Sequence, residues 1–419
     1  MTHSTSPRFL ITTTMLAALS LGLTACSDPV ATNKPSASAN KADQTLHERT
    51  LTLDTHIDIP LTYMKEIDPK WDTDLQVDLP KLREGALDSG FWIIYTPQGE
   101  LDAAGYKAGL AIAETRYRAI QSFVVAYPED VALALSAADV RETVAKGKHA
   151  VLMGMENAYP LGPTIDQVPL WARRGVRYMG ITHFGHNQFG DSSNPNPVRD
   201  SGPRHNGLST LGKALVRAMN ENGIMVDVSH AGKQTMMQAA DLSRTPIIAS
   251  HSGAKAIADS PRNLDDEQLR KIAEVGGVAQ MVALGAYVKV QTSAQLQALE
   301  AASIKYGVSN SQDYDALDDA TKVLVDAERA RIAAMEPLAT VADFVDHIDH
   351  VVKVAGIDHV GIASDFDGGG GIIGWQDASE TANVTDELVK RGYSEEDIAK
   401  IWGGNLLRVM ESVEQTARR

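Results

Sequence analysis

The sequence predicts an α/β fold, a (β/α)8 barrel of the TIM type. Short runs of aliphatic and β-branched residues alternate with longer amphipathic stretches along the chain. Continuous apolar runs are typical of parallel strands that helices cover on both faces. Eight such runs occur, at Leu51–Leu53, Gly90–Tyr95, Ala150–Met155, Tyr178–Thr182, Ile224–Val228, Pro246–Ser250, Val275–Val282 and Val360–Ala363. Eight strands with helices between them predict a closed barrel.

Helical stretches are expected between these strands, and two of the three clearest carry start or stop signals. The clearest are Leu101–Ala126, Leu208–Glu221 and Thr340–Ala355. Ser209 lies at the start of the second, where a hydroxyl can cap free backbone N–H groups, and Asn222-Gly223 follows its end. Gly356 stops the third. These signals support an alternation of strands and helices through most of the chain.

One stretch, from Thr292 to Met335, interrupts this alternation after the seventh strand. It is rich in charged residues and alanine, and it contains no apolar run of the strand type. We therefore expect a helical insertion over residues 292–335. A surface helical hairpin is the simpler interpretation, and a lid over the mouth of the site is the alternative.

The N-terminus predicts export and lipid anchoring. A small positive region at Arg8 precedes the mostly apolar stretch Phe9–Leu23, and Leu23-Thr24-Ala25-Cys26 resembles a bacterial lipobox. We expect residues 1–25 to be a lipoprotein signal peptide and Cys26 to be lipidated. Residues 26–45 are polar and form the expected flexible tether, and residues 46–419 form the barrel domain. An ordinary signal peptide with an incidental cysteine is the alternative.

Charge and cysteine content exclude several classes of function. The net charge is −15, and loss of residues 1–25, which hold one arginine and no acid, makes it −16. Such an acidic protein is unsuited to nucleic acid or to electrostatic adhesion on anionic lipid. Cys26 is the only cysteine, which excludes an internal disulfide framework and thiolate metal sites. The composition suits a soluble enzyme that a lipid anchor holds to a membrane of the bacterial cell envelope, facing the periplasm or the exterior.

Potential metal ligands stand at the ends of the predicted strands. Residues two apart in a strand point to the same side, so His56 and Asp58 can converge on one ion. In a barrel, the carboxyl ends of the strands surround a single pocket. The residues at such ends are His56, Asp58, Glu156, His183, His230, His251 and Asp365. Together they predict a metal site, although each histidine alone is more often a structural residue.

The ligand types indicate the metal and the chemistry. Imidazole and carboxylate ligands without sulfur suit Zn²⁺ or a similar divalent ion. Three histidines and three carboxylates exceed one tetrahedral site, and they suit two ions bridged by a carboxylate. Two adjacent ions can activate water and polarise a carbonyl. This chemistry hydrolyses amides, esters or phosphoesters, and the ligands alone do not choose among them.

Ten short motifs, in order along the chain, resemble the membrane (renal-type) dipeptidases, the M19 metallopeptidases. They are Asp54–Asp58, Val77–Gly85, Met153–Glu156, Gly180–His183, Gly207–Gly212, Val226–His230, Ser250–Ser252, Arg262–Asn263, Val360–Gly368 and Gly403–Arg408. The resemblance runs from about residue 48 to the C-terminus. It implies a TIM-like barrel of the metal-dependent hydrolase type and a dipeptidase activity. Dipeptides with a D-residue at the C-terminal position are among the substrates implied.

The resemblance also implies two zinc ions per chain and assigns their ligands. His56 and Asp58 match ligands of the first ion, and Glu156 matches the carboxylate that bridges both. His230 and His251 match ligands of the second ion. Other amidohydrolase barrels usually open with His-x-His, whereas this chain has His-x-Asp on its first strand. The difference favours the dipeptidase branch.

Three further roles follow from the resemblance. Asp365 matches a ligand of the first ion that also shuttles a proton. His183 matches a histidine that contacts the substrate and helps to hold the oxyanion. Arg262 matches an arginine that clamps the terminal carboxylate of the substrate, a task suited to a planar, permanently charged fork.

Departures from the family and rival functions define the alternatives. Mammalian members carry structural cysteines and a C-terminal lipid-anchor signal, and this chain has a lipobox in their place. Another amidohydrolase, such as an N-acyl-amino-acid deacylase or a lactonase, is the first alternative. A solute-binding lipoprotein would share the lipobox, but it would not need seven ligand-type residues at strand ends. The sequence leaves a homodimer open.

Overall fold

The structure is a computed structural model that describes residues 44–196, 199–308, 317–335 and 338–417. The predicted signal peptide, Cys26 and most of the predicted tether lie outside these residues. The chain from Gln44 onward forms one compact unit. Among the described residues, no helix combines the length and apolar character needed to cross a membrane.

Parallel strands form the centre of this unit, and the predicted barrel fold is confirmed. Their order in the sheet is β1-β2-β4-β5-β6-β7-β8-β9, with β3 paired to β4 outside this path. The strands are β1 Leu53–Ile57, β2 Ser89–Tyr95, β3 Val131–Leu133, β4 His149–Glu156, β5 Val176–Gly180, β6 Met225–Asp227, β7 Ile248–Ser252, β8 Val278–Val282 and β9 Val360–Ala363. Every residue of β1, β4, β7 and β8 is buried, as expected for strands covered on both faces.

Hydrogen bonds between the first and last strands bring the sheet close to a full circle. Just beyond β9, the amide of Asp365 donates to the carbonyl oxygen of His56 at 3.1 Å, and the amide of Asp58 donates to that of Phe366 at 2.9 Å. Both bonds lie at the carboxyl ends of the strands. They place the candidate residues of β1 directly beside Asp365.

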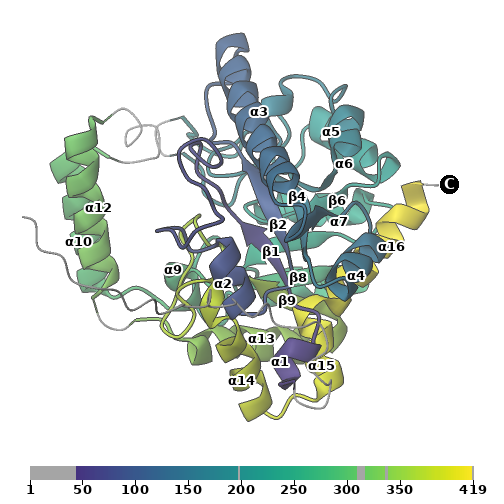
Figure 1. Cartoon of the computed structure of the whole chain (residues 1–419). Coiled ribbons are helices and arrows are strands. Elements are labelled where there is room, and N and C mark those ends of the chain that lie inside the picture. Colours follow the sequence, from purple (N-terminus) through teal and green to yellow (C-terminus); the bar gives the residue numbers. More distant parts are fainter. Residues whose placement is uncertain (1–43, 197–198, 309–316, 336–337, 418–419) are drawn as a thin grey trace, which may run out of the picture. The chain divides into compact units, whose positions relative to one another are not determined.

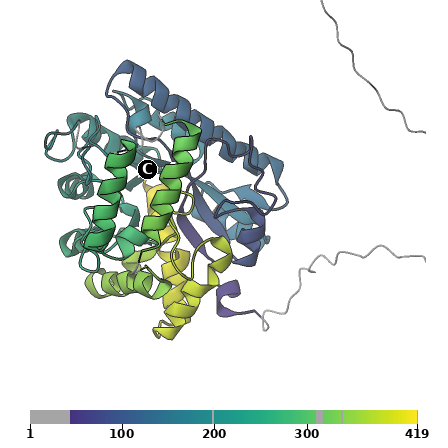
Figure 2. The same cartoon turned by 90° about the vertical axis from the view of Figure 1, so that its left-hand side faces the viewer.

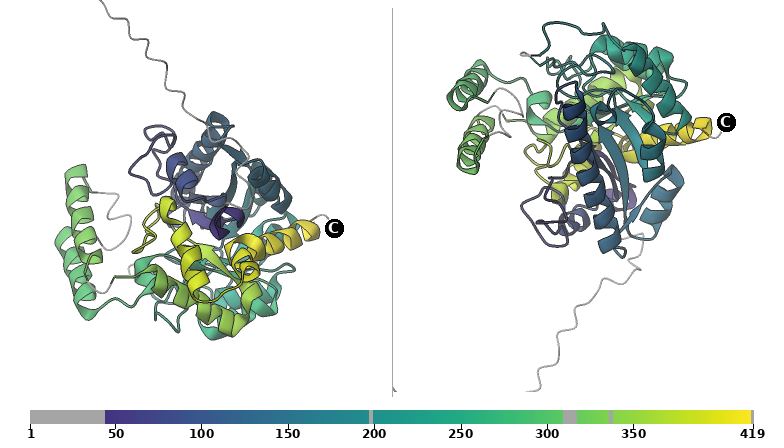
Figure 3. Two further views of the ribbon diagram at one scale, coloured as in Figure 1. Left: turned by 60° about the horizontal axis from the view of Figure 1, so that its bottom comes forward. Right: turned by 90° about the horizontal axis from the view of Figure 1, so that it is seen from above.

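Helices surround the strands (Figures 1 and 3). They are α1 Leu46–Arg49, α2 Leu79–Glu84, α3 Ala103–Ala126, α4 Ala137–Ala145, α5 Val168–Arg174, α6 Thr210–Glu221, α7 Lys233–Leu242, α8 Asp266–Glu274, α9 Gly285–Val288, α10 Ser293–Tyr306, α12 Asp319–Ala333, α13 Val341–Ala355, α14 Ala382–Lys390, α15 Glu395–Ala399 and α16 Asn405–Ala417. Helices α10 and α12 lie side by side in front of the barrel in Figure 2. The predicted caps are present, because the Ser209 hydroxyl accepts from the Gly212 amide and Thr340 forms a capping box with Asp343.

The opposite end of the barrel is closed by the C-terminal helix. The first residues of four strands, Leu53, Met225, Ile248 and Val278, belong to one buried apolar cluster. Leu406, Leu407 and Met410 of α16 belong to the same cluster. Helix α16 therefore covers the N-terminal ends of the strands, and the carboxyl ends remain for the site.

The structure corrects several predicted boundaries. The apolar run Leu51–Leu53 marks only the start of the first strand, which lies at residues 53–57 and carries His56. Its polar residues are buried in the protein interior, so they add no apolar signal. The predicted strand Val275–Val282 begins too early, since Val275 caps α8 and Gly276 turns the chain at φ 73°. Strand β3 was not predicted, because three residues are too few to give a periodic signal.

Candidate active site

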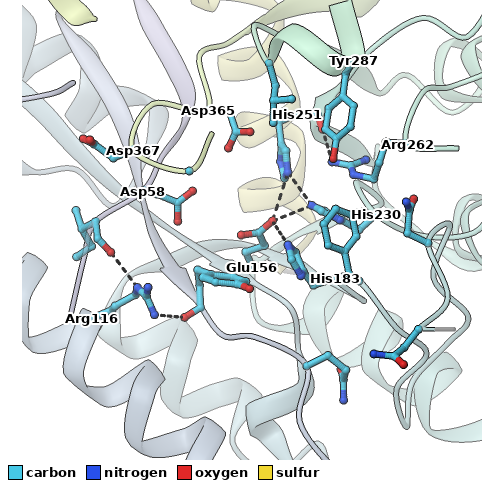
Figure 4. A pocket seen from close by; sticks show the side chains of 18 of the residues that line it. Asp58, Arg116, Glu156, His183, His230, His251, Arg262, Tyr287, Asp365 and Asp367 are labelled. Carbon is cyan, nitrogen blue, oxygen red and sulfur yellow. Dashed lines mark hydrogen bonds and ion pairs between the residues drawn. The ribbon is translucent and has the colours of Figure 1, made fainter. Parts of the chain in front are cut away.

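The carboxyl ends of the strands bring the predicted site residues around one cavity of about 690 Å³. Glu156 ends β4 and His251 lies in β7, while His183, His230 and Asp365 follow β5, β6 and β9. Figure 4 shows Glu156 facing the three imidazoles of His183, His230 and His251. Asp58 lines the same cavity, and His56 is fully buried beneath it.

Potential ligand atoms form three groups, and all members of each group lie within 4.8 Å of one another. The groups are His56 with Asp58 and Glu156, Glu156 with His230 and His251, and His56 with His251 and Asp365. Glu156, His56 and His251 each belong to two of these groups. The two oxygens of Glu156 face different histidines, with Oε2 3.6 Å from Nε2 of His56 and Oε1 2.9 Å from Nε2 of His230. All six predicted metal ligands are therefore brought together.

The polar atoms in these groups are better placed to coordinate divalent cations than to form hydrogen bonds with one another. Nε2 of His230 lies 2.9 Å from Nε2 of His251 and 2.9 Å from Oε1 of Glu156. Nε2 of His56 is buried without a hydrogen-bond partner, 3.3 Å from Oδ2 of Asp58. Buried nitrogen and oxygen lone pairs that converge in this way need a cation between them. Three imidazoles and three carboxylates are a donor set that Zn²⁺ accepts.

Burial keeps two of the histidines in the form that binds metals. Burial, helped by nearby positive charge on Arg262, lowers the pKa of His230 well below its usual value. Burial and the neighbouring His56 do the same to the pKa of His251. Neutral imidazoles offer a lone pair to a metal ion, whereas imidazolium does not.

The carboxyl groups of the site are shifted in opposite directions. Burial opposes ionisation of Glu156, but electrostatic attraction to the imidazoles of His183 and His56 holds the pKa of Glu156 well below its usual range. Burial raises the pKa of Asp365 to about 8, although His56 acts to lower it. The like charges of Asp58 and Glu156 add to the increase. A bound cation would favour the ionised form of both groups.

Hydrogen bonds to Nδ1 orient two of the ligand histidines. Nδ1 of His56 lies 3.0 Å from the hydroxyl of Tyr178, which donates to the carbonyl oxygen of Thr55. Nδ1 of His251 lies 2.9 Å from the Ser250 hydroxyl, which donates to Asp227 at 2.8 Å. Each relay makes Nδ1 the protonated nitrogen and leaves Nε2 as the ligand atom.

These relays contain residues that the sequence analysis did not assign. The sequence places Tyr178 only at the start of a predicted strand, and Asp227 and Ser250 only within two of the short motifs. A buried aspartate one strand away from a histidine has no local signature. The only sequence signal for Asp227 is the motif Val226-Asp-Val-Ser-His230, which also contains the ligand His230.

Left-handed backbone conformations concentrate at the site. His230 has φ 64° and Asp365 has φ 60°, and Asn157, next to Glu156, has φ 72°. Residues with a Cβ adopt this region at a cost, and such positions cluster at functional sites. At His230 and Asp365 the conformation turns the chain sharply after the strand, and both side chains line the cavity.

The two remaining predicted residues also line the cavity. Nε2 of His183 lies 3.7 Å from Oε1 of Glu156, and its ring packs against Tyr95 and His230. Arg262 is 2% exposed and donates to the His251 carbonyl oxygen at 3.0 Å. Its Nε is buried without a partner, and no carboxylate among the described residues pairs with it. A buried guanidinium of this kind suits an anionic ligand.

Comparison with other proteins assigns the chain to a known family. The family model described as membrane dipeptidase (peptidase family M19) matches residues 40–419. The chain belongs to this family. It is 31% identical over 351 residues to dipeptidase aclJ of Aspergillus oryzae, covering 82% of this chain and 71% of the relative. It is 31% identical over 346 residues to dipeptidase tcpJ of Claviceps purpurea, covering 81% and 70%.

Solved structures agree with the family assignment. The probable dipeptidase PvdM of Pseudomonas aeruginosa is 38% identical, with a TM-score of 0.79 over 89% of this chain and 97% of that one. A metallopeptidase of Rhodobacter sphaeroides, liganded with a phosphinate mimic of L-Ala-D-Ala, is 24% identical, with a TM-score of 0.69 over 87% and 99%. The latter supports the fold. The M19 protein is therefore a peptide hydrolase of the dipeptidase class, and family membership implies a bound metal.

Proposed function

We propose that this M19 protein is a two-zinc dipeptidase that accepts a D-residue at the C-terminal position of its substrate. The observation that carries the two-metal part is the position of Glu156, whose Oε2 lies 3.6 Å from Nε2 of His56 while its Oε1 lies 2.9 Å from Nε2 of His230 and 3.3 Å from Nε2 of His251. The D-residue is suggested by the relative from Rhodobacter sphaeroides, whose ligand mimics L-Ala-D-Ala.

In this proposal, the two ligand sets share Glu156. His56, Asp58 and Asp365 would hold the first ion, and His230 and His251 the second. Bound divalent ions supply Lewis acidity and an activated water at neutral pH. The relays through Tyr178 and Ser250 keep the imidazoles aimed at the ions.

The remaining steps belong to side chains of the cavity. Arg262 binds the C-terminal carboxylate of the dipeptide and so fixes the scissile bond over Glu156. His183 donates a hydrogen bond to the carbonyl oxygen as negative charge develops there. Asp365 accepts a proton from the attacking water and delivers it to the leaving amine nitrogen. Oδ1 of Asp365 lies 3.8 Å from Nε2 of His56, so its carboxylate lies beside the ligands of the first ion.

A screen of substrates tests this proposal against the alternatives. Purified protein would be assayed with L,L-, L,D- and D,D-dipeptides, N-acyl-amino acids and lactones. We expect rapid release of amino acids from L,L- and L,D-dipeptides. Faster turnover of an N-acyl-amino acid or a lactone than of every dipeptide would favour the deacylase or lactonase alternative.

We also propose that Cys26 is lipidated and anchors the protein to a membrane of the bacterial cell envelope. The lipobox-like Leu23-Thr24-Ala25-Cys26 and the polar tether after it support this proposal. One acyl chain binds a membrane weakly, and two or more anchor it stably. Wild-type protein should therefore fractionate with membranes in its host, and processed Cys26→Ser should be soluble. A processed Cys26→Ser chain that stays with membranes would overturn the anchor. Light scattering on the soluble protein would test the homodimer.

A further inference from the structure

Two fully buried aspartates lie next to the candidate ligands without being ligands themselves. Asp54 lies in β1 and Asp227 ends β6, and their exposed fractions are 0% and 1%. Neither belongs to the three groups of ligand atoms, and neither lines the cavity. A buried carboxylate is costly unless hydrogen bonds or opposite charge compensate it. The partners of these two carboxylates therefore indicate what they do.

The carboxylate of Asp54 holds two backbone amides at the ligands of the first ion. Its Oδ1 accepts from the amide of His56 at 3.0 Å and from the amide of Ser364 at 2.9 Å. His56 is itself a candidate ligand, and Ser364 directly precedes the candidate ligand Asp365. One oxygen atom thus joins β1 to the end of β9 at the point where both segments deliver a ligand.

The carboxylate of Asp227 does the same at the ligands of the second ion. Its Oδ1 accepts from the amide of Ser229 at 3.0 Å and from the amide of Ser250 at 2.8 Å. Ser229 directly precedes His230, and Ser250 directly precedes His251. Oδ2 of Asp227 also accepts from the Ser250 hydroxyl at 2.8 Å, in the relay to His251.

The two aspartates share one pattern of hydrogen bonds. Each accepts from the amide two positions later in its own segment, a local bond that aspartate often forms. Each also accepts from an amide beside the neighbouring strand, so it fixes two strand ends relative to each other. Asp54 contacts only segments that carry first-ion ligands, whereas Asp227 contacts only segments that carry second-ion ligands. The barrel therefore has one such carboxylate for each ion.

We propose that Asp54 and Asp227 are positioning residues, the first for the ligands of the first ion and the second for the ligands of the second ion. The inference rests on the proposed two-zinc function. Loss of a hydrogen bond that orients ligands typically costs about 10- to 100-fold in metal affinity. Because each carboxylate holds one ligand set, its loss should weaken the binding of one ion and spare the other.

The test measures the affinity for each ion separately. Metal-free protein would be titrated with Zn²⁺ against chelators of known affinity, which resolves two binding steps. Asp58→Ala and His230→Ala each remove a ligand of one ion, so they show which step belongs to which ion. We expect Asp54→Ala to weaken the first-ion step by about 10- to 100-fold and to leave the other within about threefold. Asp227→Ala should do the reverse.

Asp88→Ala is the matched control. The Asp88 carboxylate also accepts from a backbone amide, that of Thr52 at 3.1 Å, but this amide lies just before β1 begins, at the opposite end of the barrel. The variant removes the same kind of bond at a distance from both ligand sets. It should leave both binding steps unchanged, and thermal unfolding of the metal-free proteins reports on the fold separately.

Asparagine variants keep the test decisive if the alanine variants do not fold. Asparagine retains one oxygen that can accept from both amides. Oδ2 of Asp54 has no hydrogen-bond partner, so Asp54→Asn should lose less first-ion affinity than Asp54→Ala. The amide nitrogen of Asp227→Asn cannot accept from the Ser250 hydroxyl, so this variant should still weaken the second-ion step about tenfold.

The pattern across the two steps decides the inference. Unchanged affinities, or a similar loss in both steps as general destabilisation would produce, would overturn it. Loss in the step that belongs to the other ion would also overturn it. A wild-type protein that binds fewer than two ions would instead refute the proposed two-zinc function itself.

Discussion

The hydroxyl of Tyr178 lies 3.0 Å from Nδ1 of His56 and 3.1 Å from the carbonyl oxygen of Thr55. Because the carbonyl can only accept, the hydroxyl donates to it and accepts from Nδ1–H. This arrangement directs the lone pair of Nε2 toward Asp58 and Glu156. Gly154 makes room for the ring, since a Cβ there would lie 2.3 Å from Cζ of Tyr178.

Tyr178→Phe should weaken metal binding without unfolding the barrel. Loss of such an outer hydrogen bond typically costs about 10- to 100-fold in metal affinity. Competition with a chelator of known affinity measures the effect, and thermal unfolding reports on the fold. Tyr63→Phe is the control, because the Tyr63 hydroxyl is buried without a partner. Equal metal affinities in the two variants would show that Tyr178 does not orient His56.

Glu156→Gln should remove the shared ligand and most of the activity. The amide is nearly isosteric but neutral, so it cannot balance the charge of two ions. We expect fewer than two ions per chain and a loss of kcat of at least about 100-fold, which corresponds to roughly 2.7 kcal/mol of barrier. Asp367→Asn is the control within the same cavity, because Asp367 belongs to none of the three ligand groups. Wild-type turnover by Glu156→Gln would exclude Glu156 as the bridge.

Arg262→Ala should mainly weaken hydrolysis of substrates that have a free C-terminal carboxylate. Loss of one partner of a buried charged pair costs roughly 2–5 kcal/mol. C-terminally amidated dipeptides lack that partner, so they should be poor substrates of the wild type and lose little more. The measurement is kcat/KM for both substrate types in both proteins. Equal losses would mean that Arg262 does not bind the carboxylate.

His149 should make the fold less stable in mild acid. Burial lowers its pKa to about 4 from the usual 6.5, against a hydrogen bond to the Leu87 carbonyl. Between these values the unfolded chain binds more protons, so the free energy of unfolding falls as pH drops from 6.5 to 4. The effect is about 3 kcal/mol.

The pH effect is read as a difference between two proteins, because other groups titrate in the same window. Burial raises the pKa of Asp88 to about 6, which stabilises the fold as pH falls and opposes the effect of His149. Urea unfolding of wild type and His149→Gln from pH 7 to pH 4 isolates the histidine. We expect the stability advantage of wild type over the variant to shrink toward pH 4. A constant difference would show that His149 does not titrate as described.

The sequence was sufficient to predict the parts of the site that follow from local patterns. His56, Glu156 and His251 each end or follow a short apolar run, and parallel strands must bring such ends together. The barrel was predictable for the same reason. Arg262 was assigned by family resemblance, because its loop has no periodic pattern.

Other features depend on packing between distant segments. Tyr178 reaches His56 across 122 positions, and Asp227 reaches Ser250 across 23. These contacts depend on strand register and side-chain direction, which one sequence does not specify. Arg329 lies in a helix whose pattern predicts only an exposed surface, and its place beside the cavity depends on how the insertion folds back.

The central claim is that two divalent ions, shared through Glu156, make this M19 protein a dipeptidase. The most direct test is a titration of metal-free protein with Zn²⁺ while bound metal and L-Ala-D-Ala hydrolysis are measured together. The account predicts that activity rises until two ions are bound per chain and then stops rising. Full activity at one ion per chain, with no further gain from a second, would contradict it.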